Sequence, residues 1–262
     1  LNNEAVRNFD FWHFFVSSPN NMADGLYRPL LSIVNSITFQ IFGFNAWGYH
    51  ILPILLHILN SYLIFRIFTR VLKFKNTPSF LGALIYLVHP LQTESVAYIA
   101  GLPEPMGTLW VLLGMILFTD AIHLKKGSAK IWKSIGAISM FVLALLSKES
   151  MIVMAGLVVL FTIYLWPQLK KPTRKSALYL SGVFAGMAAL YLFLKFSFLY
   201  FSEEILMGYE GAYNDHMWVR LVTFCHSMWE YTVLMLYPIH LYFEKPYIYF
   251  TSLLSFKGIA GL

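Results

Sequence analysis

The feature that most limits the fold of this chain is a succession of apolar runs long enough to cross a lipid bilayer. A helix needs about 17–25 mainly apolar residues to span the hydrocarbon core. Five runs of about this length occur, at 47–72, 106–122, 151–166, 177–194 and 217–237. Charged residues make up only 12% of the sequence, well below the usual share of a soluble domain. The sequence therefore predicts an all-α, polytopic membrane protein and excludes a water-soluble globule.

Two shorter apolar runs are also candidates for membrane helices. Residues 80–88 lie between Pro78 and Pro90, and residues 131–146 are interrupted only by Lys133. Short or tilted spans of this kind are tolerated in membrane proteins. With them, we expect about seven membrane helices within residues 47–238.

The distribution of charge supports this count, because loops between successive spans alternate between the two sides of the membrane. One side receives 12 of the 19 Lys and Arg residues, in the segments 66–75, 125–133 and 170–175. The other side receives 10 of the 13 acidic residues. Basic loops face the cytoplasm, so the acidic side is predicted to be extracytoplasmic. The net charge of +6 then reflects orientation in a lipid bilayer, and no nucleic-acid partner is expected.

The segment before the first long run has a different character. Residues 1–26 are polar and aromatic, as expected for part of a first extracytoplasmic loop. Residues 28–42 are predicted to form an interfacial helix, with Pro29 in its first turn and Gly43 at its end. Because the chain starts without Met and stops within an aromatic stretch, we interpret residues 1–262 as a single transmembrane domain, a fragment of a longer protein.

The most informative charged cluster is Ser147-Lys148-Glu149-Ser150, between two apolar runs on the predicted extracytoplasmic side. One interpretation is two helix ends with snorkelling side chains and a local ion pair. The other is a site in which Lys148 receives a phosphate and Glu149 orients it. A lysine on this side runs against the charge asymmetry, which favours the functional interpretation.

Further candidates share the predicted extracytoplasmic side. His89, Glu94 and Glu104 lie in a proline-punctuated connection that either forms a shaped site or is an ordinary loop with capping carboxylates. Arg28 precedes the interfacial helix, where a guanidinium can clamp a lipid phosphate or act as an anchor. We predict that these four residues, with Lys148 and Glu149, bind substrate.

Soluble-enzyme motifs such as a Gly-rich phosphate loop, HExxH or GxSxG are absent from the sequence. The single Cys225 and eight scattered histidines predict neither a disulfide nor a metal site. His57 and Asn60 share one face of the first span, which favours polar contacts between helices over a site.

Taken in order, several stretches resemble a known family: LNNEAVRNFDFW, YRPLL, IFGFNAWGYHILPILLHILN, HPLQTESVAYIAGLPEPMGTLW, LLSKES and RLVTFCHSMWEYTVLMLYPIHL. The chain resembles the membrane region of GT-C fold glycosyltransferases. Within that class it is most similar to the transmembrane and tetratricopeptide repeat-containing (TMTC) O-mannosyltransferases and their bacterial relatives. The resemblance covers nearly the whole chain.

The resemblance implies a GT-C-like helical bundle that moves a sugar from a polyprenyl-phosphate donor to a protein acceptor on the extracytoplasmic face. The sugar that it implies is mannose. It also implies that a first helix and the catalytic acid lie upstream of Leu1, that tetratricopeptide repeats follow the membrane region, and that the fragment alone is inactive. No cofactor beyond the donor is implied. Leu102 stands where many relatives have an arginine.

Two other functions remain open from the residues themselves. A polytopic transporter or lipid flippase would also need several spans with polar groups, but inverted repeats are not visible. A non-catalytic membrane scaffold is the third possibility. Localisation is in a membrane in each case, either the bacterial inner membrane or the endoplasmic reticulum.

Overall fold

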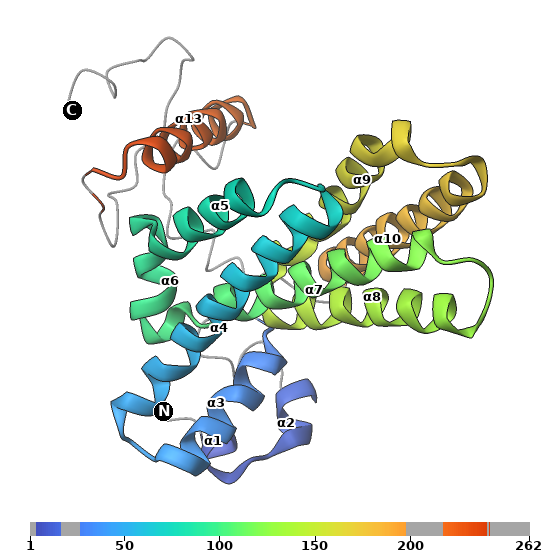
Figure 1. The fold of residues 1–262 in the computed structure, drawn as a ribbon. Coiled ribbons are helices and arrows are strands. Elements are labelled where there is room, and N and C mark those ends of the chain that lie inside the picture. The colour runs from blue at the N-terminus through green and yellow to red at the C-terminus, as the bar shows by residue number, and fades with distance from the viewer. Residues whose placement is uncertain (1–3, 17–26, 198–216, 240, 242–262) are drawn as a thin grey trace. The chain divides into compact units, whose positions relative to one another are not determined.

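The computed structural model of the chain describes residues 4–16, 27–197, 217–239 and 241, and every regular element in these ranges is helical. The chain divides into two compact units, residues 1–200 and 201–262. The helices of the first unit are α1 (Glu4–Asn8), α2 (Phe11–Val16), α3 (Pro29–Phe42), α4 (Ala46–Arg66), α5 (Asn76–Val88), α6 (Thr93–Ala97), α7 (Pro103–His123), α8 (Ser128–Ser147), α9 (Val153–Leu165) and α10 (Lys171–Ser197) (Figure 1). Short helical turns extend or join them: η2 (Ile67–Val71), η3 (Pro90–Gln92), η4 (Ile99–Gly101), η5 (Glu149–Ile152) and η6 (Trp166–Gln168). The second unit contains α13 (Met217–Leu236).

All seven predicted membrane segments are helices, and five helical stretches are long and apolar enough to cross a membrane: 46–71, 99–123, 128–147, 149–168 and 171–195. Helix α5 has 13 residues and is therefore about 20 Å long, less than the ~30 Å thickness of a hydrocarbon core. Helix α13 has 20 residues but falls outside the apolar set. The protein is an all-α, multi-pass integral membrane protein, whereas a total of seven spans stays a prediction.

Hydrogen bonds between helices show the direction in which neighbouring helices run. Ser61 Oγ on α4 donates to the carbonyl of Ala83 on α5 at 2.8 Å. One turn earlier on α4, His57 Nε2 lies 3.0 Å from the carbonyl of Leu87, which is later on α5. Helices α4 and α5 are therefore antiparallel, and His57 makes the interhelical contact that the sequence favours.

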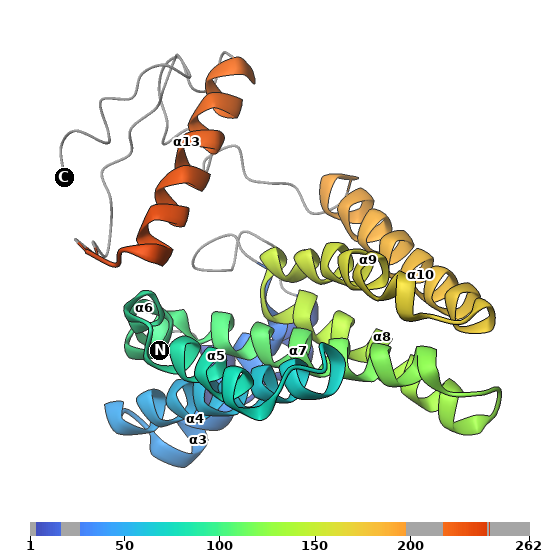
Figure 2. The same cartoon turned by 45° about the horizontal axis from the view of Figure 1, so that its top comes forward.

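The core of the first unit lies among α7, α8, α9 and α10. The rings of Phe118, Phe141 and Phe184 are fully buried there, one from each of α7, α8 and α10. The ring centroid of Phe184 lies 5.3 Å from that of Phe141 and 6.2 Å from that of Phe118. Met154 on α9 is also fully buried. Figures 1 and 2 both show the α7–α8 turn and the α9–α10 turn at the same end of this bundle.

Glycines let α7 pack closely against the segment that follows α8. A Cβ added at Gly107 would lie 2.7 Å from the Met151 side chain of η5, and one added at Gly114 would lie 2.2 Å from Met154 of α9. Small residues at helix interfaces permit such close approach in membranes. This packing holds the start of α7 beside the end of α8.

Helix α3 confirms that residues 28–42 contain a helix, and Pro29 occupies its first helical position as expected. It packs against α1, α2, α4 and α8. Gln40 Nε2 of α3 donates to the carbonyl of Arg7, joining α3 to α1 at 2.6 Å. Helices α1 and α2 lie within the predicted extracytoplasmic segment 1–26, of which residues 1–3 and 17–26 lie outside the described residues. The interfacial position of α3 stays a prediction.

Candidate functional site

Four of the six predicted site residues meet at one end of the bundle as two ion pairs. Arg28 donates to Glu149 Oε2 through Nη2 at 3.1 Å and through Nε at 3.3 Å. Lys148 Nζ donates to Glu104 Oε1. The partners are 121 and 44 residues apart in the sequence, so both pairs connect distant segments. A local ion pair within the 147–150 turn does not describe these contacts.

The backbone of Lys148 explains why neighbouring charges take different partners. Helix α8 ends at Ser147, and Lys148 has an extended conformation with φ −159° and ψ 139° before η5 begins. Successive side chains of an extended backbone point to opposite sides. Lys148 accordingly contacts the first turn of α7, whereas Glu149 contacts the residue that precedes α3.

The helices that supply the partners begin with prolines, which have the backbone φ that a first helical turn requires. Pro29 starts α3 directly after Arg28, and Pro103 starts α7 directly before Glu104. Both prolines are fully buried. The local sequence thus fixes where each charged side chain leaves its helix.

The two ion pairs differ in the exposed fraction of their side chains. The side chains of Arg28 and Glu149 are 21% and 16% exposed, and those of Lys148 and Glu104 are 25% and 39% exposed. Partial burial strengthens each attraction relative to bulk water. The Lys148 ammonium and the Glu104 carboxylate still remain accessible to an incoming charged group.

His89 and Glu94 lie in the neighbouring connection between α5 and α7. His89 Nδ1 accepts the backbone N–H of Leu91 at 3.2 Å and so caps η3. Glu94 is exposed in the first turn of α6, a stabilising position for a carboxylate. The described contacts thus join four predicted site residues directly and place these two on the adjacent segment.

Contacts of helix α4 show that the connection between α5 and α7 lies at the same height in the bundle as the ion pairs. Asn60 Nδ2 on α4 donates to the carbonyl of Pro105 at 2.8 Å, in the first turn of α7. His57, about one turn earlier on α4, contacts Leu87 near the end of α5. The end of α5 and the start of α7 therefore lie at similar heights in the bundle.

Two tyrosines border the Arg28–Glu149 pair. Tyr27 precedes Arg28, and burial raises the pKa of its phenol above the usual 10.0, so it keeps its proton and can donate a hydrogen bond at neutral pH. Tyr191 of α10 lies within electrostatic reach of both Glu149 and Arg28. Among the described residues, no cluster of three His, Cys, Asp or Glu side chains could hold a metal ion.

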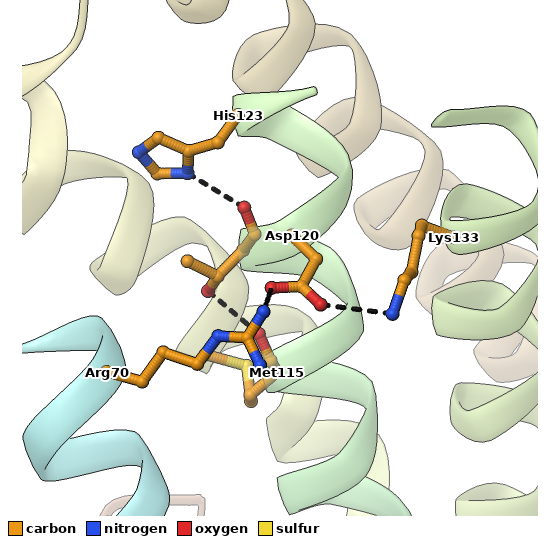
Figure 3. Close-up of polar contacts among 6 residues, drawn as sticks. Arg70, Met115, Asp120, His123 and Lys133 are labelled. Atoms are coloured by element: carbon orange, nitrogen blue, oxygen red, sulfur yellow. Dashed lines mark hydrogen bonds and ion pairs between the residues drawn. The ribbon is translucent and has the colours of Figure 1, made fainter. Parts of the chain in front are cut away.

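A second charged cluster, which was not predicted from the sequence, lies at the opposite end of the bundle. Asp120 Oδ1 on α7 accepts from Arg70 at 2.8 Å, and Asp120 Oδ2 accepts from Lys133 on α8 at 3.1 Å (Figure 3). Asp120 is an isolated acid at the basic end of an apolar run, and this position in the sequence could have indicated the cluster. These bonds place the segments 66–75 and 125–133 at one end, as the predicted topology requires.

Comparisons with known proteins place these features in context. A family model described as dolichyl-phosphate-mannose-protein mannosyltransferase matches residues 28–196. The human protein O-mannosyl-transferase TMTC2 is 26% identical over 200 residues, which cover 76% of this chain and 23% of the relative. Human protein O-mannosyl-transferase TMTC4 is 32% identical over 171 residues, covering 59% and 23%. Tmtc2 of Drosophila melanogaster is 26% identical over 231 residues, covering 83% and 23%. No solved structure matches the chain.

Proposed function

The chain belongs to the dolichyl-phosphate-mannose-protein mannosyltransferase family, and from this premise we propose that it forms membrane machinery for transferring mannose to protein. The donor would be a polyprenyl-phosphate-linked mannose, bound at the end of the bundle that carries Arg28 and Lys148. That end would face the extracytoplasmic side. The matched part of the chain spans 23% of the length of human TMTC2 and of human TMTC4, so the activity proposed is that of the complete protein.

The observation that carries this proposal is the pair of cations held by carboxylates at a single helix junction. Lys148 and Arg28 come from different elements, yet the turn at 148–149 joins their two ion pairs, because it contains Lys148 itself and Glu149, the partner of Arg28. A partly exposed ammonium can exchange its carboxylate for a phosphate oxygen, because both are oxygen anions with similar hydrogen-bond geometry.

The chemistry of sugar transfer explains why a cation is needed there. As the bond between the anomeric carbon and the phosphate oxygen breaks, the phosphate changes from a diester to a monoester and gains negative charge. A preorganised cation near the phosphate lowers the energy of this transition state. An acidic side chain that removes the acceptor proton would complete the reaction, and we expect it upstream of Leu1.

Glu104 would then act as a positioning residue. It holds Lys148 in place before the donor arrives, and it provides the charge to which Lys148 returns when polyprenyl phosphate leaves. His89, Glu94 and Glu149 would shape the same end of the bundle without contacting the reacting bond. Other residues of the complete protein would bind the acceptor.

The test uses the complete protein, with polyprenyl-phosphate-mannose and an acceptor protein. Lys148→Gln should lower kcat/KM for transfer by about 10²-fold, the usual cost of losing one donor to a developing anion. Lys126→Gln is the matched control, because Lys126 is an exposed lysine in the α7–α8 turn. Wild-type transfer by Lys148→Gln would refute the donor site.

The same assay separates the other functions. Movement of the lipid donor across vesicles without release of polyprenyl phosphate would identify a transporter. Neither movement nor cleavage by the wild-type protein would identify a scaffold. Release of polyprenyl phosphate that depends on Lys148 supports the glycosyltransferase.

A further inference from the structure

An apolar groove runs between α9 and α10, away from the two ion pairs. Its volume is about 520 Å³, and its lining includes Val159, Ile163, Trp166, Leu178, Gly182 and Ala185. Thr162 and Ser181 also line it, but their hydroxyl groups hydrogen-bond to each other at 2.8 Å. The groove therefore presents hydrocarbon to whatever occupies it.

One end of the groove reaches a cluster of cations at the start of α10. Trp166 lines the groove, and the guanidinium carbon of Arg174 lies 4.9 Å from the centroid of its ring system. Arg174 Nε is buried and has no hydrogen-bond partner among the described residues. Lys170, Lys171 and Lys175 flank it in the sequence. A guanidinium with an unsatisfied N–H group thus stacks on Trp166, which is part of the groove lining.

No acid in the surrounding sequence balances these cations. The segment 150–202 contains five Lys and Arg residues and no Asp or Glu. The basic residues at the neighbouring end of α7 are different, because Asp120 binds both Arg70 and Lys133 (Figure 3). Two basic connections lie at the same end of the bundle, and only one of them has an internal counter-ion in the described structure.

We propose that the groove between α9 and α10 is a binding site for one anionic phospholipid. An acyl chain would lie along the apolar lining, and the phosphate would accept hydrogen bonds from Arg174, with Lys171 nearby. The amino-terminal end of α10 adds its helix dipole in the same place, which also favours an anion. This lipid would sit in the leaflet opposite the two ion pairs and would not be a substrate.

The cationic cluster and the apolar groove contribute separately to lipid binding, and a different variant removes each contribution. Each Lys or Arg near a membrane surface attracts anionic lipid with about 1 kcal/mol, which is about fivefold in affinity. Arg174→Gln should therefore lower the preference for anionic lipid about fivefold. Arg174→Lys keeps the charge and should retain most of the preference.

Gly182→Leu tests the acyl-chain site without changing charge. A Cβ at Gly182 would meet nothing within 4 Å, so a larger side chain can enter the groove without striking the protein. Gly186→Leu is the matched control, because that position is equally open and does not line the groove. Lys126→Gln is the matched control for charge at the same end of the bundle.

The measurement is native mass spectrometry of the chain after exchange into equimolar phosphatidylglycerol and phosphatidylcholine of identical acyl chains. We expect one retained phosphatidylglycerol, at least fivefold over phosphatidylcholine. Gly182→Leu should reduce its retention at least fivefold, whereas Gly186→Leu and Lys126→Gln should match wild type. Circular dichroism and size-exclusion chromatography establish that each variant is folded.

Three results would overturn the proposal. Equal retention of the two lipids would show that the cations do not select an anion. Unchanged retention in both Arg174→Gln and Gly182→Leu would show that lipid binds elsewhere. A dimer that Gly182→Leu dissociates would show that a second copy of the chain occupies the groove.

Discussion

The ion pair between Arg28 and Glu149 should contribute measurably to stability, because it joins α3 to the α8–η5 junction in a partly buried place. Its Nη2–Oε2 distance is 3.1 Å, and its side chains are 21% and 16% exposed. At this separation the gross attraction is about 5 kcal/mol at an effective dielectric constant of about 20. Desolvation of both charges offsets much of this attraction.

The expected magnitude follows from removing one partner at a time. Loss of one member of a fully buried pair costs about 3–5 kcal/mol, and exposed pairs contribute about 0.2–1 kcal/mol. Arg28→Gln and Glu149→Gln should each cost about 2 kcal/mol of unfolding free energy, between these limits. The double variant should cost about 2.5 kcal/mol, since neither charge is then left unpaired, giving a coupling energy of about 1.5 kcal/mol.

Arg70 provides the matched comparison. Arg70 is 51% exposed, and its partner Asp120 keeps a second cation, Lys133, at 3.1 Å when Arg70 is removed. Arg70→Gln should therefore cost about 0.5 kcal/mol of unfolding free energy. Added salt should reduce this cost further, because it screens the exposed ion pair.

Reversible unfolding in mixed detergent micelles, followed by far-ultraviolet circular dichroism, gives each free energy. A coupling energy between Arg28 and Glu149 below about 0.5 kcal/mol, the value for an exposed pair, would contradict a stabilising partly buried pair. Equal destabilisation by Arg70→Gln and Arg28→Gln would contradict it as well.

Three further predictions concern packing and the donor site. Phe141→Ala should cost about 3–5 kcal/mol of unfolding free energy, because the ring is fully buried in the core, and unfolding in micelles measures this. Gly101→Ala should cost about 1–3 kcal/mol in the same measurement, because the added Cβ would lie 2.8 Å from the backbone oxygen of Glu94. Gly182→Ala should be neutral or stabilising, because a Cβ there meets nothing within 4 Å. Equal effects of the two glycine variants would contradict this difference in packing. In the complete protein, Glu104→Gln should increase product inhibition by polyprenyl phosphate several-fold, because Lys148 then lacks the charge to which it returns, and unchanged inhibition would rule out this role.

Several elements of the fold were predictable because they depend on one segment at a time. Each predicted membrane segment is a helix, since a backbone in hydrocarbon must satisfy its own hydrogen bonds. The prolines at Pro29 and Pro103 mark helix starts for an equally local reason. The length of α5 shows the limit, because whether 13 residues cross a bilayer depends on what surrounds them.

The candidate site was predictable as a set of residues but not as a set of contacts. Charge asymmetry and the family resemblance indicated that Arg28, Glu104, Lys148 and Glu149 share one side. Lys148 could have paired with its neighbour Glu149, and nothing in the order of residues indicates Glu104 instead. Asp120 was missed for the same reason, since its partners come from η2 and α8.

The sequence by itself determined which segments are helices, that the protein is an integral membrane protein, and that the basic segments 66–75 and 125–133 lie at one end of the bundle. These properties arise from the length, apolarity and flanking residues of each run, so each segment carries them alone. The tertiary structure decided which charges neutralise one another and which, like Arg174, keep an unsatisfied group. Those choices depend on which helices pack together, and packing is the sum of many small contacts between segments that are distant in the chain.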